Sequence, residues 1–361
     1  MSEESTDLYI ETIDLSAAPK PACDENNIPI VMSSSEQYLP YTCTTLYSLL
    51  KNGSTENFYD IFLINSGYSE HGIFLLEHTV KSWNNVSIRL VNSRLASGCF
   101  SEGHISADTY SRLLIPKFMQ NYTDVIYLDS DTIVCTDIAK ILDESSNAGA
   151  YMLSGVPDLD IIGQYCGADY SIRYYLKHKL GLCSPAGYLQ AGVLVFHVPK
   201  ILSVYTADCF LEYGKRSKLR FFDQDILNAL CNGYTQQLDF RWNVVTDCDG
   251  FRVSRIIKKA PNGIYMRYLR SREQPWIIHY SGHQKPWNAG QGTDFDDLFW
   301  EMASDAKIIP YIQRENAEQN KKTMIRNAVE MILPKWTKRR MLFKTIYMEI
   351  KYKKIRPEEK L

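Results

Sequence analysis

The chain has 361 residues, of which 45% are hydrophobic and 23% charged, and its formal net charge is −2. These values are ordinary for a globular protein, and the length suffices for one large α/β domain with additions or for two smaller domains. No stretch approaches the roughly 18–20 consecutive apolar residues of a membrane-spanning helix, so the composition excludes an integral helical membrane protein.

The nine cysteines are scattered, odd in number and never in C-x-x-C spacing. This pattern argues against a zinc ribbon or a disulfide scaffold and favours a reducing compartment. The N-terminus is acidic and polar, without the basic and apolar regions of a signal peptide. We therefore expect a cytoplasmic protein.

The first part of the chain alternates between strand and helix patterns. Residues 1–27 are polar and acidic and are predicted to be a loosely ordered extension. Three strand–helix pairs then follow, with strands at 28–32, 58–64 and 86–91 and helices at 39–50, 73–83 and 107–121. Such alternation predicts the start of a mostly parallel sheet flanked by helices.

The remaining elements are less regular. The apolar run 125–128 predicts a fourth strand, and later strands are expected at 149–156, 189–198, 235–238 and 276–280. The helical patterns lie at 172–180, 201–215, 222–231, 295–302 and 308–312. We expect one catalytic domain over 28–315 and a helical tail over 316–361.

Two aspartates follow the fourth strand. Asp129 and Asp131 stand one residue apart where the apolar run ends. Ligands collect at the carboxyl ends of strands in open α/β sheets, and two carboxylates so spaced can share one hard cation when the backbone turns there. The alternative is a pair of solvated loop aspartates, since an isolated D-x-D is short and common.

A second polar group follows the last predicted strand. His279 ends an apolar run, as Asp129 does, and one imidazole nitrogen with two carboxylates suits Mn²⁺ better than Ca²⁺. Gly282 permits a close backbone approach, and Lys285 could place an ammonium on a phosphate. The alternative for His279 is a structural histidine.

The run Asp223-Gln224-Asp225 begins a predicted helix. Asp223 alone would satisfy simple N-capping, which is the alternative to a functional role. Arg112, 17 residues before Asp129, is by default a surface residue of a predicted helix.

Six motifs occur in a fixed order, and they are YSRL at 110–113, VIYLDSD at 125–131, AGVLV at 191–195, DQDILN at 223–228, LDFRWNV at 238–244 and HYSGHQKPW at 279–287. This order, over roughly residues 28–300, resembles the family 8 retaining glycosyltransferases, the group of the bacterial lipopolysaccharide galactosyltransferases and glycogenin.

The resemblance implies a GT-A fold, a UDP-sugar donor, and Mn²⁺ or Mg²⁺ as cofactor. It implies metal ligation by Asp129, Asp131 and His279, and diphosphate contacts from Gly282 and Lys285. The remaining implied contacts with donor and acceptor are Tyr38 stacking on uracil, Ser35 in the uridine loop, His104 at the donor–acceptor cleft, and Arg112, Gln190, Asp223 and Gln224 at the donor sugar.

Two positions depart from the family pattern. Ser35 stands where the family usually has an acidic residue, so recognition of the base is expected to differ. Gln190 stands where the family usually has Asn, and the longer amide could change which sugar fits. Both departures leave the expected metal ligands intact.

The implied reaction is the transfer of a hexose, glucose or galactose, to a glycan or surface-polysaccharide acceptor with retention. Stabilising the UDP leaving group is its main electrostatic demand. No carboxylate is an obvious nucleophile, so we expect same-face attack with Gln224 stabilising charge. A nucleotide-sugar-binding protein without activity remains an alternative. So does a haloacid-dehalogenase-type phosphatase, whose motif L-D-x-D-T is matched at 128–132 but normally opens its domain.

The C-terminal stretch has a different composition. Residues 320–361 hold 13 Lys or Arg against 4 Glu, and 335–344 mix cations with Trp, Leu and Phe. Such a stretch can lie on an anionic membrane, each basic residue adding roughly 1 kcal/mol near the lipids. The alternative is an amphipathic helix docked on its own domain. No recognised nucleic-acid-binding motif accompanies the charge, so we expect no nucleic-acid partner.

Overall fold

A computed structural model describes residues 10–13, 17–92, 107–146, 149–167, 170–216, 219–248, 250–288, 293–318 and 321. The chain divides into two compact units, residues 1–309 and 310–361. In the second unit, residues 310–318 are helical. All strands described below belong to the first unit.

The first unit is built on an eight-stranded sheet with the order β1-β4-β3-β2-β5-β8-β7-β9. Its strands are β1 Ile10–Ile13, β2 Asn27–Ser33, β3 Phe58–Asn65, β4 Val86–Asn92, β5 Asp124–Leu128, β7 Leu153–Pro157, β8 Leu189–His197 and β9 Thr235–Gln237. The five strands from β1 to β5 are mutually parallel, β8 runs antiparallel to both β5 and β7, and β9 pairs in parallel with β7. The prediction of a mostly parallel sheet is confirmed.

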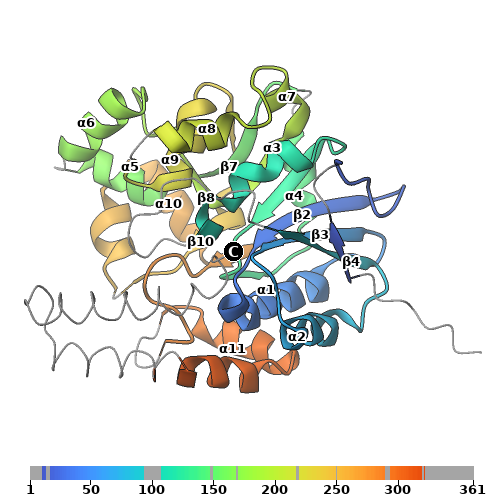
Figure 1. The fold of residues 1–361 in the computed structure, drawn as a ribbon. Helices are drawn as coiled ribbons and strands as arrows, with labels where there is room; N and C mark the ends of the chain where they lie inside the picture. The colour runs from blue at the N-terminus through green and yellow to red at the C-terminus, as the bar shows by residue number, and fades with distance from the viewer. Residues whose placement is uncertain are drawn as a thin grey trace, which may run out of the picture. The chain divides into compact units, whose positions relative to one another are not determined.

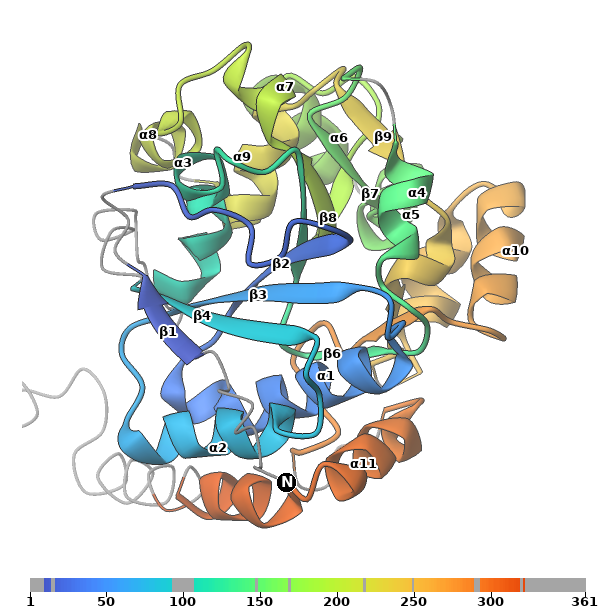
Figure 2. The ribbon, with the colours of Figure 1, turned by 90° about the vertical axis from the view of Figure 1, so that its right-hand side faces the viewer.

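Helices cover the two faces of this sheet, and Figure 2 shows α1, α2 and α11 on one side and α3, α8 and α9 on the other. Their bounds are α1 Leu39–Asn52, α2 Glu70–Val80, α3 Ile115–Phe118, α8 Cys209–Arg216, α9 Phe222–Leu230 and α11 Asp296–Asp305. The other helical elements, several of them labelled in Figure 1, are η1 Glu36–Tyr38, η3 Ala107–Leu114, α4 Lys140–Ser145, α5 Leu159–Cys166, α6 Tyr170–Lys179, α7 Val198–Leu202, η4 Phe240–Asn243, the π-helix η5 Arg252–Ile256, η6 Ile257–Lys259 and α10 Asn262–Ser271.

A second, three-stranded sheet has the order β10-β11-β6, formed by Val244–Val245, Ile277–His279 and Thr132–Val134. β11 runs antiparallel to β6 and places His279 opposite Thr132. The backbone N–H of Tyr280 donates to the carbonyl of Asp131. This small sheet therefore brings the histidine predicted as a ligand to the turn that carries the two aspartates.

The core forms where apolar runs of the central strands meet apolar helix faces. The β5 residues Val125, Ile126, Tyr127 and Leu128 are each 1% exposed or less. A strand buried on both faces reads as a continuous apolar run, which is why this one was recognisable in the sequence. Because the run is buried to its last residue, the next side chain, Asp129, is the first polar group at that edge of the sheet.

Several elements differ from the predictions. Residues 10–13, within the predicted loosely ordered extension, form β1 against the edge strand β4. The helix predicted over 107–121 is a 3₁₀ segment followed by α3, where Pro116 occupies the first turn and has no N–H to continue a preceding helix. The helix predicted over 201–215 is divided into α7 and α8. The elements α5 and α10 were not predicted.

Candidate active site

The Asp129–Asp131 segment is a tight turn between β5 and β6 that neighbouring elements fix in place. The Asp129 amide donates to the carbonyl of Gly192 on β8 at 2.8 Å. The Ser130 hydroxyl donates to the carbonyl of Ser33, the last residue of β2, also at 2.8 Å. Thr45 of α1 donates to the carbonyls of Ser130 and Thr132. The turn is therefore held by both strands that flank β5 in the main sheet, β2 and β8, and by helix α1.

His279 faces this turn, so the structure brings together the three predicted ligands. Its Nε2 lies 3.7 Å from Oδ2 of Asp129 and 3.3 Å from Oδ1 of Asp131. One ligand atom from each residue lies within 4.8 Å of the others. The imidazole is 2% exposed, whereas the two carboxylates are partly open.

The imidazole packs directly on the backbone of β8 because residue 192 is glycine. A Cβ at Gly192 would lie 2.2 Å from Cε1 of His279 and 2.8 Å from Oδ2 of Asp129. Real Cβ atoms never approach other atoms so closely, so any larger residue at 192 would displace a predicted ligand.

These donors fit a divalent cation of the Mn²⁺ or Mg²⁺ type. The Nδ1 of His279 lies 3.0 Å from Oδ1 of Asn243, which can only accept. A hydrogen bond from a ligand's second nitrogen fixes its tautomer and leaves Nε2 free to coordinate. Nε2 then faces two carboxylate oxygens, an arrangement that a cation makes favourable. The set of one nitrogen and two oxygens suits Mn²⁺.

Arg112 is not the surface residue that is the default expectation for its position. The side chain is buried and joins two acidic groups, with Nη2 3.0 Å from Oδ1 of Asp129 and Nε 2.7 Å from Oδ2 of Asp223. Its guanidinium lies over the ring of Tyr127, 4.3 Å from the centroid. Tyr127 in turn donates to Asp129. Arg112 thus connects the D-x-D turn to the start of α9.

Asp223 lies in the first turn of α9 and is not its N-cap, which is Phe221. Burial raises the pKa of Asp223 to about 6, with a further contribution from Asp129, while Arg112 acts in the opposite direction. Phe222, immediately before it, has a φ of 49°, a left-handed conformation that is rare for a bulky residue. Such local strain clusters at functional sites, which favours a functional role over simple capping.

Gln224 is held by both ends of its amide. Its Oε1 accepts from the Ala191 N–H at 3.0 Å, and its Nε2 donates to Oδ2 of Asp158 at 2.8 Å. Asn228, one turn later, bonds both backbone groups of Leu189. Helix α9 is therefore attached to the first residues of β8 by two amide side chains with i, i+4 spacing, which fixes Gln224 in orientation.

Lys285 lies beside the three predicted metal ligands, Asp129, Asp131 and His279. Its ammonium contacts the Oδ2 of Asp131 and donates to the carbonyl of Tyr280 at 2.5 Å. Burial acts to raise the pKa of Asp131, but Lys285 and His279 outweigh it and hold that pKa below its usual range. Gly282, between them in sequence, has a φ of +107°, which L side chains rarely adopt.

Tyr38 and Ser35 lie in the segment after β2. The Tyr38 ring packs edge-on against Tyr41 and Trp287, at centroid distances of 5.0 and 5.8 Å. Burial raises the pKa of Tyr38, and the charges of Asp131 and Asp129 raise it further. Ser35 precedes η1 without a side-chain capping bond. Trp287 is stacked on Tyr41 at a centroid distance of 4.1 Å. It ends the HYSGHQKPW motif but was not predicted as a site residue.

The side chain of Gln190 bonds within the protein. Its Oε1 accepts from the Gly192 N–H and from Nδ2 of Asn243, both at 2.6 Å. Asn243 is 2% exposed and was not predicted as a site residue. His104 lies outside the described residues.

A pocket of about 190 Å³ lies beside Gln190 and Gln224. Its lining also includes Asp158, Asp160 and Asn243. Asp158 caps α5, and burial raises its pKa. Burial also raises the pKa of Asp160 to about 6, although Arg252 pairs with it at 3.0 Å. Neither acid was predicted as a site residue, since Asp158 simply follows the strand predicted over 149–156.

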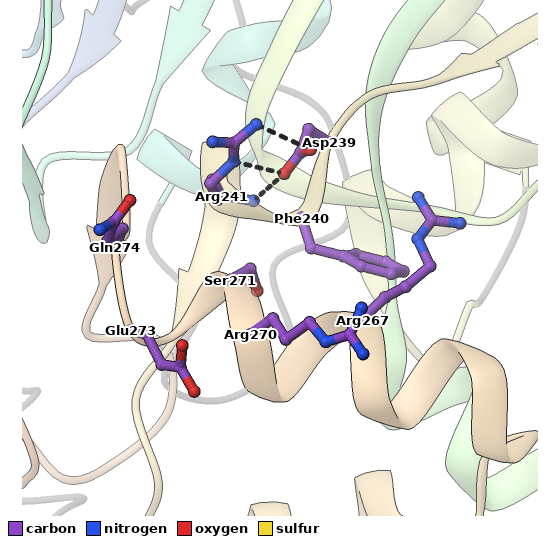
Figure 3. A pocket seen from close by; sticks show the side chains of 8 residues that line it. All are labelled: Asp239, Phe240, Arg241, Arg267, Arg270, Ser271, Glu273 and Gln274. Carbon is purple, nitrogen blue, oxygen red and sulfur yellow. Dashed lines mark hydrogen bonds and ion pairs between the residues drawn. The ribbon is translucent and has the colours of Figure 1, made fainter.

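A second pocket, of about 370 Å³, is lined by residues of η4 and α10 and of the segments beside them (Figure 3). Its lining contains none of the site residues predicted from the sequence. It consists of Asp239, Phe240, Arg241, Arg267, Arg270, Ser271, Glu273 and Gln274. Arg241 is committed to Asp239, at 3.0 Å, and to the ring of Trp276. Asp129, Asp131 and His279, with the residues around them, therefore remain the candidate active site.

The family model described as "Glycosyl transferase family 8" matches residues 29–290. General stress protein A of Bacillus subtilis (strain 168) is 24% identical over 287 residues, covering 77% of this chain and 93% of that protein. Glycosyltransferase GlyF of Streptococcus pneumoniae serotype 4 (strain ATCC BAA-334 / TIGR4) is 24% identical over 308 residues, covering 82% of this chain and 68% of that protein.

Two solved structures are similar in fold. The apo structure of the WbbM bifunctional glycosyltransferase is 27% identical with a TM-score of 0.73, covering 83% of this chain and 53% of that chain. The galactosyltransferase LgtC in complex with donor and acceptor sugar analogs is 22% identical with a TM-score of 0.63, covering 77% of this chain and 96% of that chain. The mixed α/β architecture thus matches that of GT-A-like glycosyltransferases.

Among the described residues, no helix is long and apolar enough to span a bilayer. The eight cysteines that the structure describes are all free of disulfide bonds.

Proposed function

Because the chain belongs to glycosyl transferase family 8, we propose that it transfers a hexose, glucose or galactose, from a UDP-sugar to a glycan acceptor with retention and with a divalent cation, Mn²⁺ or Mg²⁺. Membership makes the chain a glycosyltransferase. The donor, the metal and the stereochemistry are the proposal.

The observation that carries this proposal is the convergence of Asp129, Asp131 and His279 from the D-x-D turn and β11. Their ligand atoms lie within 4.8 Å of one another in the segment that the family model covers. A divalent cation bound there would stabilise the negative charge that develops on the UDP leaving group.

The residues around Asp131 suit a nucleoside diphosphate. We assign the Lys285 ammonium, already at Asp131, to the diphosphate together with the backbone at Gly282. Tyr38 offers an aromatic face for uracil beside the acidic pair, and Ser35 lies in the same segment. His104 belongs to this proposal only by sequence.

The pocket beside Gln224 suits a sugar ring in size and chemistry. Its volume is about 190 Å³, and Gln190, Gln224 and Asp158 line it. Arg112 pairs with the predicted ligand Asp129 and with Asp223, which precedes Gln224 in the chain. Fixed amides and carboxylates of this kind hydrogen-bond sugar hydroxyls and orient the anomeric carbon.

The reaction breaks the bond between the anomeric carbon and the UDP phosphate oxygen and forms one to an acceptor hydroxyl oxygen on the same face. The hydroxyl proton leaves with the phosphate oxygen. We assign Gln224 to the reacting face, as the family resemblance implies, and its side chain is an amide and not a carboxylate. Gln224 is held by Ala191 and Asp158, so its oxygen is fixed to stabilise positive charge on the sugar.

The test is release of UDP from UDP-glucose and UDP-galactose with Mn²⁺. The proposal expects UDP release with at least one donor and its loss when Mn²⁺ is chelated. A nucleotide-sugar-binding protein without activity would release nothing. A phosphatase of the haloacid-dehalogenase type, for which the family match gives no support, would release inorganic phosphate.

We further propose that the acceptor is a precursor of lipopolysaccharide, capsule or another surface glycan, met at the inner face of the cytoplasmic membrane. The support is the net charge of +9 over residues 320–361, from 13 Lys or Arg minus 4 Glu, interleaved with aromatic residues. Of that tail only residue 321 is described. Cationic aromatic segments bind anionic lipid surfaces without spanning them.

A further inference from the structure

We propose that Asn243 and Gln190 are positioning residues that lock His279 as the tautomer with its proton on Nδ1, so that the Nε2 lone pair faces the two carboxylates. This inference rests on the proposed function for the identity of the ligands, but the lock is a property of the chain without a cation.

The chain of hydrogen bonds starts at a group whose polarity is certain. The backbone N–H of Gly192 can only donate, and it lies 2.6 Å from the terminal atom of Gln190 assigned as Oε1. That atom must therefore be the amide oxygen and not the nitrogen.

The orientation of the Asn243 amide follows from this assignment. The atom of Asn243 that lies 2.6 Å from the same Gln190 oxygen must be a donor, so it is Nδ2. The other terminal atom is then Oδ1, which lies 3.0 Å from Nδ1 of His279. An amide oxygen only accepts, so Nδ1 carries the proton.

In the neutral imidazole, the consequence at Nε2 is a lone pair directed at negative charge. Nε2 lies 3.3 Å from Asp131 Oδ1 and 3.7 Å from Asp129 Oδ2. The opposite tautomer would donate to these oxygens and satisfy them without a cation. The lock removes that competing arrangement, so it favours cation binding.

Asn243 can act in this way because η4 holds it rigidly. Asp239 caps η4 and pairs with the Arg241 guanidinium, as the dashed lines of Figure 3 show. The adjacent Trp242 donates from Nε1 to Glu144 at 2.7 Å. The next residue, Asn243, is 2% exposed, so its amide has little freedom to turn.

Gln190 has the length that this network requires. Its side chain folds back to an N–H two residues later while also accepting from Asn243. Asparagine is one methylene shorter and would leave one of these two donors, both buried or half-buried, without its acceptor. The glutamine that departs from the family pattern is thus explained by tautomer control.

The first measurement is ¹⁵N NMR of the full-length chain without metal, in which two-bond couplings distinguish Nδ1–H from Nε2–H imidazoles. We expect His279, assigned by its loss in H279Q, to be the Nδ1–H tautomer. In N243L, which has the same number of side-chain heavy atoms and no acceptor, we expect a mixture or the Nε2–H tautomer. An Nε2–H form of His279 in the wild type overturns the proposal whatever N243L does.

The second measurement is the Mn²⁺ dissociation constant without donor, read from water-proton relaxation. Loss of an outer partner of a metal ligand weakens binding by about 10–100-fold, which we expect for N243L. N243D keeps an acceptor for Nδ1–H but faces Gln190 Oε1 with an oxygen in place of the donor Nδ2, so we expect its affinity to lie between those of N243L and the wild type. N85A removes an amide that donates to the carbonyls of Ser54 and Asn57, just before β3 and at the opposite end of the parallel strands from the D-x-D turn, and should change nothing.

Failure of the two proposals can be told apart. A wild type with Nδ1–H His279 and Mn²⁺ binding lost in N243L, but without UDP release, would retain the lock and reject the transferase chemistry. Wild-type Mn²⁺ affinity in folded N243L would reject the lock while leaving the proposed function in place.

Discussion

The substitution G192A adds one carbon atom, the Cβ, and tests whether the position of His279 matters for binding a cation. The added Cβ would lie 2.2 Å from Cε1 and 2.8 Å from Nδ1 of His279. Ordinary carbon contacts are about 3.5–4.0 Å, so the imidazole must move by roughly 1 Å or more. The imidazole cannot move aside as the end of a flexible side chain could, because β11 and Asn243 hold it in place.

The magnitude follows from this displacement. Ligand geometry must hold within about 0.5 Å, and a misplacement of about 1 Å can cost roughly 100-fold. We expect the Mn²⁺ dissociation constant of G192A to rise by about 100-fold, or about 2.8 kcal/mol. Overpacking should also lower the free energy of unfolding by about 1–3 kcal/mol.

The assay is Mn²⁺ titration by water-proton relaxation, with unfolding followed by urea denaturation. The matched control is G263A, since a Cβ at Gly263 on α10 meets nothing within 4 Å. G263A should bind Mn²⁺ as the wild type does. Wild-type Mn²⁺ affinity in folded G192A would refute the reasoning, because it would show that His279 in its present position is not needed to bind the cation.

Three further outcomes are expected. D131A should abolish UDP release while circular dichroism stays native, because it removes a predicted ligand; turnover at saturating Mn²⁺ would reject the assignment. The raised pKa of Asp223, about 6 against an ordinary 3.8, means that between pH 4 and 6 the native state binds more protons than the unfolded state. Stability should therefore fall as pH rises, by up to about 3 kcal/mol, and D223N should lack this contribution; equal slopes for the two proteins in urea denaturation would contradict it. Deleting residues 320–361 should weaken sedimentation with anionic liposomes without loss of UDP release; unchanged sedimentation would favour a tail docked on its own domain.

Local patterns were enough to predict most strands of the main sheet and the acidic turn. The β5 run is apolar to its last residue and then gives two aspartates, a signal that needs no tertiary information. His279 could be placed with them because it also ends a strand. The structure confirms the mostly parallel sheet and brings the three side chains together.

The partners of these residues could not be predicted, because they depend on contacts distant in sequence. Arg112 carries no local sign that it will be buried between Asp129 and Asp223. Asn243 belongs to a quoted motif, yet its role depends on Gln190, 53 residues away. A short edge strand such as β1 is stabilised by its neighbour β4 more than by its own composition.

The ladder between β6 and β11 has a consequence for how the chain folds. It closes a loop that contains β7, β8 and all of α4 to α10, and Lys285 meets Asp131 across 154 residues. Loops of such length close slowly, since the entropy of closure must be overcome before the contacts form. We therefore expect the end of the sheet that carries the three predicted ligands to be among the last parts to assemble. A chain still being synthesised would carry the D-x-D turn long before it could bind a cation there.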